Sequence, residues 1–177
     1  MRVVLKPLGC MGAAGLIFAA QFFCTFSSLA AGPTEAWEAH RATAEDQRAI
    51  EVLLNNYTRS VTEGDSQLFE SQLLHRSIPF SYVDEDASFN PSAASVSDYA
   101  GFKASVFDSG QRFHQSFSHV EIRQDANLAQ VSLDFETRSD TTGKGARGWK
   151  VLQLLRVQGH WKIASELYTA YSIEKAR

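Results

Sequence analysis

The chain has 177 residues, of which 44% are hydrophobic and 21% charged, and its formal net charge is −3. Both cysteines, Cys10 and Cys24, lie in the first 31 residues, so the rest of the chain has no disulfide, thiol nucleophile or thiolate metal site. Removal of those residues leaves about 146, enough for one domain, with 15 basic and 20 acidic side chains and a net charge of −5. This acidic balance argues against a nucleic-acid partner, which requires a basic surface.

Residues 1–31 have the three parts of a secretory signal: a basic start, an uncharged stretch over residues 7–26 and small residues at the exit. We expect cleavage after Ala30 or Ala31. An uncleaved membrane anchor is the alternative, because the stretch is close to the roughly 20 residues that a membrane span requires. Gln21 and the small residues at the exit favour removal. The sequence therefore predicts a periplasmic or secreted protein with no membrane contact after cleavage.

The first helix is predicted to begin where a tether ends. Thr43 followed by Asp46 resembles a capping box, and apolar residues recur at helical spacing over residues 50–61. Gly64 ends this helix, and one of the two residues after it caps a second, shorter helix. The boundaries expected for the whole chain are a signal peptide at residues 1–31, a tether at 32–44 and a domain at 45–173.

A strand is predicted next, because apolar side chains alternate with polar ones at Ile78, Phe80 and Tyr82. Pro79 cannot donate a backbone hydrogen bond and indicates an edge position for this strand. Residues 84–95 are rich in polar and turn-forming side chains and are predicted to form a loop.

Ser97 is expected to cap a third helix, which Gly110 ends, and the apolar period then changes to two. Four strands are predicted at residues 112–123, 128–138, 147–157 and 160–171. Gln158-Gly159 joins the last two as a tight hairpin. Helices followed by a meander indicate an α+β fold. We expect a cone-shaped barrel in which three helices pack on a strongly curved antiparallel sheet and leave a cavity.

Two segments carry a resemblance to a known family. The run from Ala49 to Asp65 resembles the opening helix of nuclear transport factor 2-like domains, with a tyrosine, six residues and then Gly-Asp. The run from Leu154 to Ile163 looks like their last hairpin. The resemblance covers about residues 45–172. Within the superfamily the chain is similar to polyketide-cyclase-like, lumazine-binding-like and ketosteroid-isomerase-like small domains.

The resemblance implies roles for particular residues. Tyr57 falls where the isomerases of this superfamily place the tyrosine that hydrogen-bonds the substrate oxyanion. The position of their general-base aspartate falls near Tyr82, with Asp84 two residues later, and their second oxyanion acid aligns with Gln153. A catalytic pair of Tyr57 and Asp84 is therefore one hypothesis. The alternatives are that Tyr57 is a core tyrosine and that Asp84 belongs to a solvated acidic turn.

A ligand-binding role is predicted for polar residues on otherwise apolar strand faces. Trp149 and Gln153 share a face of one predicted strand, and Ser165 lies on an apolar face of the next. Such stripes suit an apolar pocket with a few orienting groups, a closed core, or a surface packed against a second subunit. Tyr82 and His114 are further candidates for the pocket wall.

Metal and cofactor sites are not expected. His114 and His119 are an odd number of residues apart, so on a regular strand they face opposite sides. The glycines from Gly143 to Gly148 match a dinucleotide-binding pattern, but a predicted strand follows them where that motif requires a helix.

Three functions are consistent with these features. The first is an exported domain that binds a small, partly apolar molecule in its cone and forms a homodimer. The second is an isomerase or lyase that acts on a carbonyl compound through Tyr57 and Asp84. The third is a non-catalytic module for dimerisation or protein interaction.

Overall fold

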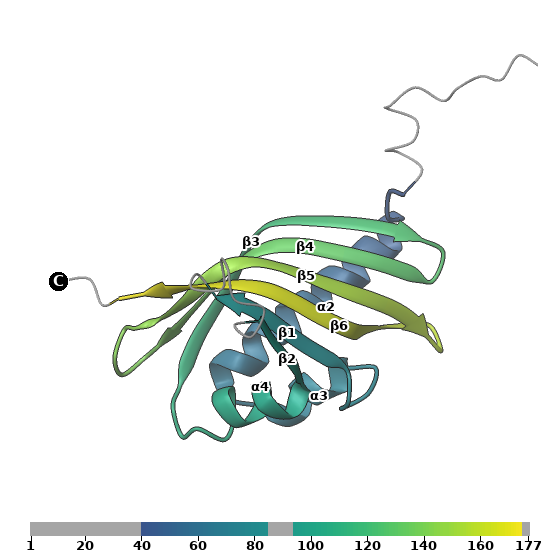
Figure 1. The fold of residues 1–177 in the computed structure, drawn as a ribbon. Helices are drawn as coiled ribbons and strands as arrows, with labels where there is room; N and C mark the ends of the chain where they lie inside the picture. Colours follow the sequence, from purple (N-terminus) through teal and green to yellow (C-terminus); the bar gives the residue numbers. More distant parts are fainter. Residues whose placement is uncertain (1–39, 85–93, 175–177) are drawn as a thin grey trace, which may run out of the picture. The chain divides into compact units, whose positions relative to one another are not determined.

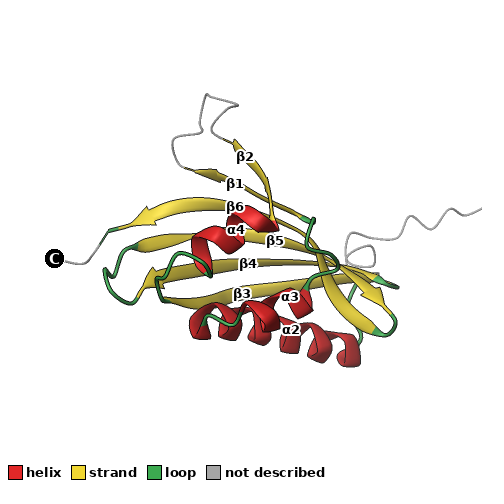
Figure 2. Cartoon of the chain, turned by 90° about the horizontal axis from the view of Figure 1, so that it is seen from below, coloured by secondary structure: helices red, strands yellow, loops and turns green. Residues whose placement is uncertain are grey.

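The structure is a computed structural model that describes residues 40–84 and 94–174. The predicted signal peptide and most of the tether lie outside these residues. The described elements are α2 (Ala44–Glu63), α3 (Ser66–Gln72), β1 (Pro79–Asp84), β2 (Ala94–Asp98), α4 (Tyr99–Val106), β3 (Phe113–Asp125), β4 (Leu128–Ser139), β5 (Gly145–Val157) and β6 (His160–Ile173). Figures 1 and 2 show one curved sheet with the helices on a single side of it.

The helix α2 begins and ends where the sequence predicts. The Thr43 side chain accepts a hydrogen bond from the backbone N–H of Asp46, and Gly64 follows the helix in the left-handed conformation at φ 70°. Asp65 then caps α3 by accepting from the backbone N–H of Leu68. No helix in the described part of the chain is both long and apolar enough to cross a membrane.

The six strands form one sheet in the order β2-β1-β6-β5-β4-β3. The expected edge position of β1 is wrong, because β1 lies between β2 and β6. Pro79 is tolerated there because it is the first residue of its strand. The pairing of β1 with β6 is parallel, with Phe80 opposite Glu166, so the sheet is mixed rather than wholly antiparallel.

The strand β2 was not predicted from the sequence. Its residues, Ala94–Asp98, include the end of the expected polar loop and pair with β1. The third helix is capped by Asp98 instead of the predicted Ser97, since the Asp98 carboxylate accepts from the backbone N–H of Ala100. The remaining strands agree with the predicted meander, and Gln158 and Gly159 form its last turn with positive φ angles of 51° and 80°.

Two bulges decide which side chains point toward the helices. One lies between Ser118 and Glu121 of β3. The other lies in β6, where Ser165 pairs with Gln153 but the neighbouring Leu154 pairs with Ile163, so that Ala164 is an extra residue. Such an extra residue reverses the alternation of the strand beyond it.

The core lies between α2 and the inner face of the sheet, by which we mean the face that carries the helices. Ile50 and Tyr57 of α2, Phe69 of α3, and Leu152 and Ile163 of the sheet are essentially inaccessible to solvent. This arrangement of three helices on a curved sheet confirms the predicted α+β cone.

Candidate functional site

A cavity of about 320 Å³ lies between α4 and the inner face of the sheet. Residues of β1, α4, β4 and β6 supply aromatic walls, among them Phe80, Tyr82, Phe102, Phe135 and Tyr168. The rings of Tyr82 and Tyr168 stack at a centroid distance of 5.5 Å. The cavity therefore offers flat, largely apolar surfaces to a ligand.

A buried polar cluster lies at the wall of this cavity. Lys150 of β5, which lines the cavity, donates to the hydroxyl of Tyr57 over 2.8 Å and lies 2.7 Å from Glu166 Oε1. Tyr57 in turn donates to Glu166 Oε2 over 2.9 Å. The side chains of Lys150 and Glu166 are 2% and 0% exposed. We call Tyr57, Lys150 and Glu166 the buried triad.

Aromatic rings surround the Lys150 ammonium. Its Nζ lies 4.7 Å from the ring centroid of Tyr57, 4.9 Å from that of Phe135 and 5.1 Å from that of Tyr168. The negative faces of these rings partly replace the water that burial removes from the charge.

Burial changes the ionisation of the triad. Removal from water raises the pKa of Tyr57 well above its usual value, and the Glu166 carboxylate adds to this effect. Burial lowers the pKa of Lys150, while the charge and hydrogen bond of Glu166 oppose that change. Tyr57 therefore remains protonated and acts as a fixed bridge between a cation and an anion.

The structure places Tyr57 in the core, behind Lys150 and packed against Phe69 at a ring distance of 4.7 Å. Because its proton is donated to Glu166, its hydroxyl is not an oxyanion donor to the cavity in this arrangement. Tyr82 lines the cavity. Asp84 is the last residue of β1 and pairs with Ala170, but its side chain lies outside the described part of the structure.

Trp149, Gln153 and Ser165 do not face the cone, contrary to the sequence prediction. In β5 the inward side chains are Lys150, Leu152 and Leu154, and the alternate positions lie on the outer face, where Trp149 is 53% exposed. Ser165 donates to Gln153 across that outer face over 2.8 Å. The reason in β6 is the bulge, which turns Ser165 outward although Ile163 points inward.

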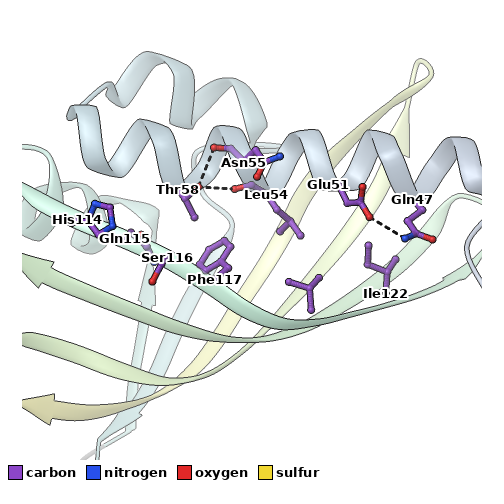
Figure 3. A pocket seen from close by; sticks show the side chains of 11 residues that line it. Gln47, Glu51, Leu54, Asn55, Thr58, His114, Gln115, Ser116, Phe117 and Ile122 are labelled. Atoms are coloured by element: carbon purple, nitrogen blue, oxygen red, sulfur yellow. Dashed lines mark hydrogen bonds between the residues drawn. The ribbon is translucent and has the colours of Figure 1, made fainter.

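His114 lies in a different place from the cone. It is exposed and lines a groove of about 710 Å³ between α2 and β3 (Figure 3). This groove is larger than the cone cavity, but most of the side chains that line it are polar. Among them are the exposed Gln47 and Glu51, which hydrogen-bond each other over 2.9 Å. We therefore regard the cone cavity, with its buried charges, as the candidate site. Across residues 40–84 and 94–174, no group of acidic, histidine or cysteine side chains is arranged to hold a metal ion.

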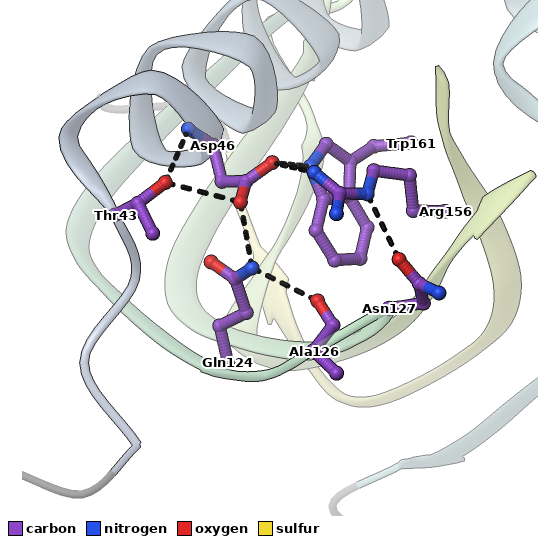
Figure 4. Close-up of polar contacts among 7 residues, drawn as sticks. All are labelled: Thr43, Asp46, Gln124, Ala126, Asn127, Arg156 and Trp161. Atoms are coloured by element: carbon purple, nitrogen blue, oxygen red, sulfur yellow. Dashed lines mark hydrogen bonds and ion pairs between the residues drawn. The ribbon is translucent and has the colours of Figure 1, made fainter. Parts of the chain in front are cut away.

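A second buried cluster surrounds Asp46 at the start of α2 (Figure 4). Its carboxylate accepts from Gln124 over 2.7 Å and from Trp161 over 2.9 Å, and it pairs with Arg156 over 2.8 Å. Gln124 belongs to β3, Arg156 to β5 and Trp161 to β6. The cluster thus joins the first turn of α2 to the sheet, which is a structural role.

The sequence interpretation did not include Lys150 and Glu166. A signal for both was present, because each is a charged residue that shares strand parity with apolar neighbours: Lys150 with the buried Leu152 and Leu154, and Glu166 with the half-buried Tyr168. The other face of β5 also carries apolar side chains, so the alternation alone did not identify the inner face.

Comparison with known proteins supports the assignment of the fold. The family model described as "Putative lumazine-binding" matches residues 45–169. A comparison with curated proteins finds no match.

Several solved structures share the fold. A nuclear transport factor 2-like protein from Shewanella baltica has 18% identity and a TM-score of 0.54, and the alignment covers 76% of this chain and all of that one. A "Putative Scytalone Dehydratase" from Novosphingobium aromaticivorans has 13% identity and a TM-score of 0.59, over 75% of this chain and 89% of that one. At these identities the likeness shows the fold. The chain belongs to the family described as putative lumazine-binding, and it has the fold of nuclear transport factor 2-like proteins.

Proposed function

We propose that the domain binds a small, largely apolar molecule in the cone cavity. The observation that carries this proposal is the cavity itself, about 320 Å³ between α4 and the sheet, with aromatic walls and the buried ammonium of Lys150. Apolar walls with a few polar groups are the usual composition of a small-molecule site. The family description and the dehydratase-like neighbour support a pocket-bearing role for this fold.

Native mass spectrometry of the protein isolated from its natural host tests this proposal. We expect the wild-type protein to retain a small molecule and the variant Val106→Trp to lose it, because Val106 lines the cavity and the larger ring fills it. Val52→Trp is the matched control, since Val52 is 58% exposed on α2. Retention of the molecule by Val106→Trp, or no retained molecule and no thermal stabilisation by a panel of apolar compounds, would contradict the proposal.

We also propose that the domain acts outside the cytoplasm. The basic, uncharged and small-residue parts of residues 1–31 support this proposal. We expect intact-mass spectrometry of the protein isolated from its host to give the mass of a chain that begins at Ala31 or Gly32. A measured mass that matches the chain with its first 31 residues retained would contradict the proposed export.

The outer face of the sheet supports a homodimer. It carries a set of exposed or half-exposed apolar side chains from two neighbouring strands: Trp149, Val151, Leu155, Val157, Leu167 and Tyr171. Several exposed apolar side chains on one face of a sheet are typical of an interaction site. We propose that a second copy of the chain covers it.

A further inference from the structure

We propose that the ligand of the cone carries an uncharged oxygen acceptor, such as a ketone or amide carbonyl, and that Lys150 Nζ donates a hydrogen bond to it. This inference rests on the proposed binding function and adds the chemical class of the ligand. It assigns to Lys150 a direct contact with the bound molecule.

The ammonium of Lys150 has more hydrogen-bond donors than it has acceptors among the described residues. A lysine ammonium has three N–H groups. The hydroxyl of Tyr57 and Oε1 of Glu166 accept two of them, and no third acceptor is present among the described residues. Lys150 lines the cavity, and we assign its third N–H to an occupant. A ligand oxygen would remove the cost of leaving a buried donor unpaired.

The charges at the wall of the cavity favour an uncharged ligand. The positive charge of Lys150 is already matched by Glu166, and both side chains are almost completely buried. Among the described residues that line the cavity, Lys150 is the only one with a charged side chain. An anionic ligand would bring a buried charge without a counter-charge, which is costly. A neutral carbonyl accepts the hydrogen bond without that cost.

The other side chains that line the cavity indicate the form of the rest of the ligand. The rings of Phe80, Tyr82, Phe102 and Tyr168 line the cavity and favour a flat apolar body. Gln115 is a second polar side chain at the wall, and it is 5% exposed. Its N–H groups provide a second contact for an oxygen atom.

Binding of three probes to the purified domain tests the inference. The probes are 1-tetralone, its hydrocarbon counterpart tetralin, and tetralin-2-carboxylate, measured by titration calorimetry, with NMR shifts of cavity residues to locate binding. We expect wild-type protein to bind 1-tetralone at least about tenfold more tightly than tetralin, as a hydrogen bond from a charged donor implies. The carboxylate should bind more weakly than the ketone.

The matched variant is the double substitution Lys150→Met with Glu166→Gln, which removes both charges together and leaves Tyr57 with an amide partner. We expect it to bind tetralin as the wild type does and to lose the preference for 1-tetralone. Should this variant not fold, the wild-type complex provides a second measurement. The infrared carbonyl stretch of bound 1-tetralone should move to lower frequency than that of the ketone in an apolar solvent.

The outcomes separate the two proposals. Equal affinity for ketone and hydrocarbon in the cavity of the wild type, or an unshifted carbonyl stretch, overturns the role of Lys150 and leaves the binding function standing. Tighter binding of the carboxylate overturns the uncharged acceptor. Absence of any probe from the cavity counts against the binding function as well.

Discussion

At the scale of single residues, the hydroxyl of Tyr57 holds the buried triad together. It accepts from Lys150 and donates to Glu166, so Tyr57→Phe removes one partner from each. Because both partners stay buried, we expect the free energy of unfolding to fall by about 1–3 kcal/mol. Urea denaturation followed by circular dichroism measures the change.

Tyr82→Phe is the control for this substitution. Tyr82 is half-buried, and its hydroxyl has no hydrogen bond to another described residue, so its removal should change stability by less than about 0.5 kcal/mol. Equal effects of the two substitutions would show that the triad does not stabilise the fold.

Buried tyrosines also set the response to alkaline pH. Burial raises the pKa of Tyr57, Tyr99 and Tyr168, with Glu166 adding to the effect at Tyr168. In the unfolded chain tyrosine ionises near pH 10, so above that pH the folded state binds more protons and stability falls as pH rises. Lys150 acts oppositely: because its folded pKa is lowered, its contribution to stability rises with pH up to about 10.4.

The comparison of Tyr168→Phe with Tyr171→Phe isolates one of these tyrosines, because Lys150 is the same in both variants. We expect Tyr168→Phe to make the decline of stability above about pH 10 shallower. Tyr171→Phe, at a position 46% exposed, is the control variant. Urea denaturation at several pH values between about 9 and 11.5 measures the slope. Identical slopes in the two variants would contradict the prediction.

At this scale the sequence predicted part of the site. Tyr57 and Tyr82 could be identified from helical and strand periodicity and from the family resemblance. Lys150 could not, because charged residues in strands are usually exposed and only the fold brings Glu166 to within 2.7 Å of it. A buried ion pair depends on two distant segments, and the strand parity of each charged residue does not show that the two charges meet.

At the scale of elements, Asp46 connects α2 to three strands, and its removal should loosen that connection. The hydrogen bond from Gln124 is the main cause that lowers the pKa of Asp46. Trp161, Thr43 and the charge of Arg156 add to it, against the effect of burial. We expect Asp46→Asn to reduce the free energy of unfolding by about 1–3 kcal/mol at pH 7.

The pH dependence identifies the cause of this loss. Since the folded pKa is lowered, the carboxylate contributes fully above about pH 3.9, and its contribution disappears as pH falls through the folded pKa. The difference between wild type and Asp46→Asn should therefore shrink in acid. Asp134→Asn, which alters an exposed contact with His119, is the control and should have little effect on stability at pH 7. A constant difference between wild type and Asp46→Asn down to pH 2 would contradict the assignment.

The strands show where sequence periodicity fails. The long strands of the meander were predicted because they alternate over many residues. The strand β2 was not, since Ala94–Asp98 has one large apolar side chain and becomes a strand by pairing with β1. The bulge at Ala164 has no marker in the sequence, and it places Glu166 inside and Ser165 outside.

At the scale of the whole molecule, the outer face of the sheet determines the proposed assembly. Leu167→Glu places a charge in the middle of the apolar set on this face, and burying it against a second copy is unfavourable. We expect wild-type protein to be a dimer and this variant a monomer by size-exclusion chromatography with light scattering. Val52→Glu is the matched control, since Val52 and Leu167 are both 58% exposed and Val52 lies on α2. A wild-type monomer, or a dimeric Leu167→Glu variant, would exclude this interface.

The position of β6 also has a consequence for the order of events during synthesis. β1 and β2 lie on one side of β6, and the other three strands, β5, β4 and β3, lie on its other side. β6 alone therefore joins the two parts of the sheet. It is also the last of the described strands to leave the ribosome. Phe80 of β1 pairs with Glu166 of β6, so this pair cannot form before β6 has been synthesised. Such long-range pairing makes folding slow. Until β6 is synthesised the sheet is incomplete, and such a delay is what the export proposed above requires of a chain that must cross a membrane unfolded.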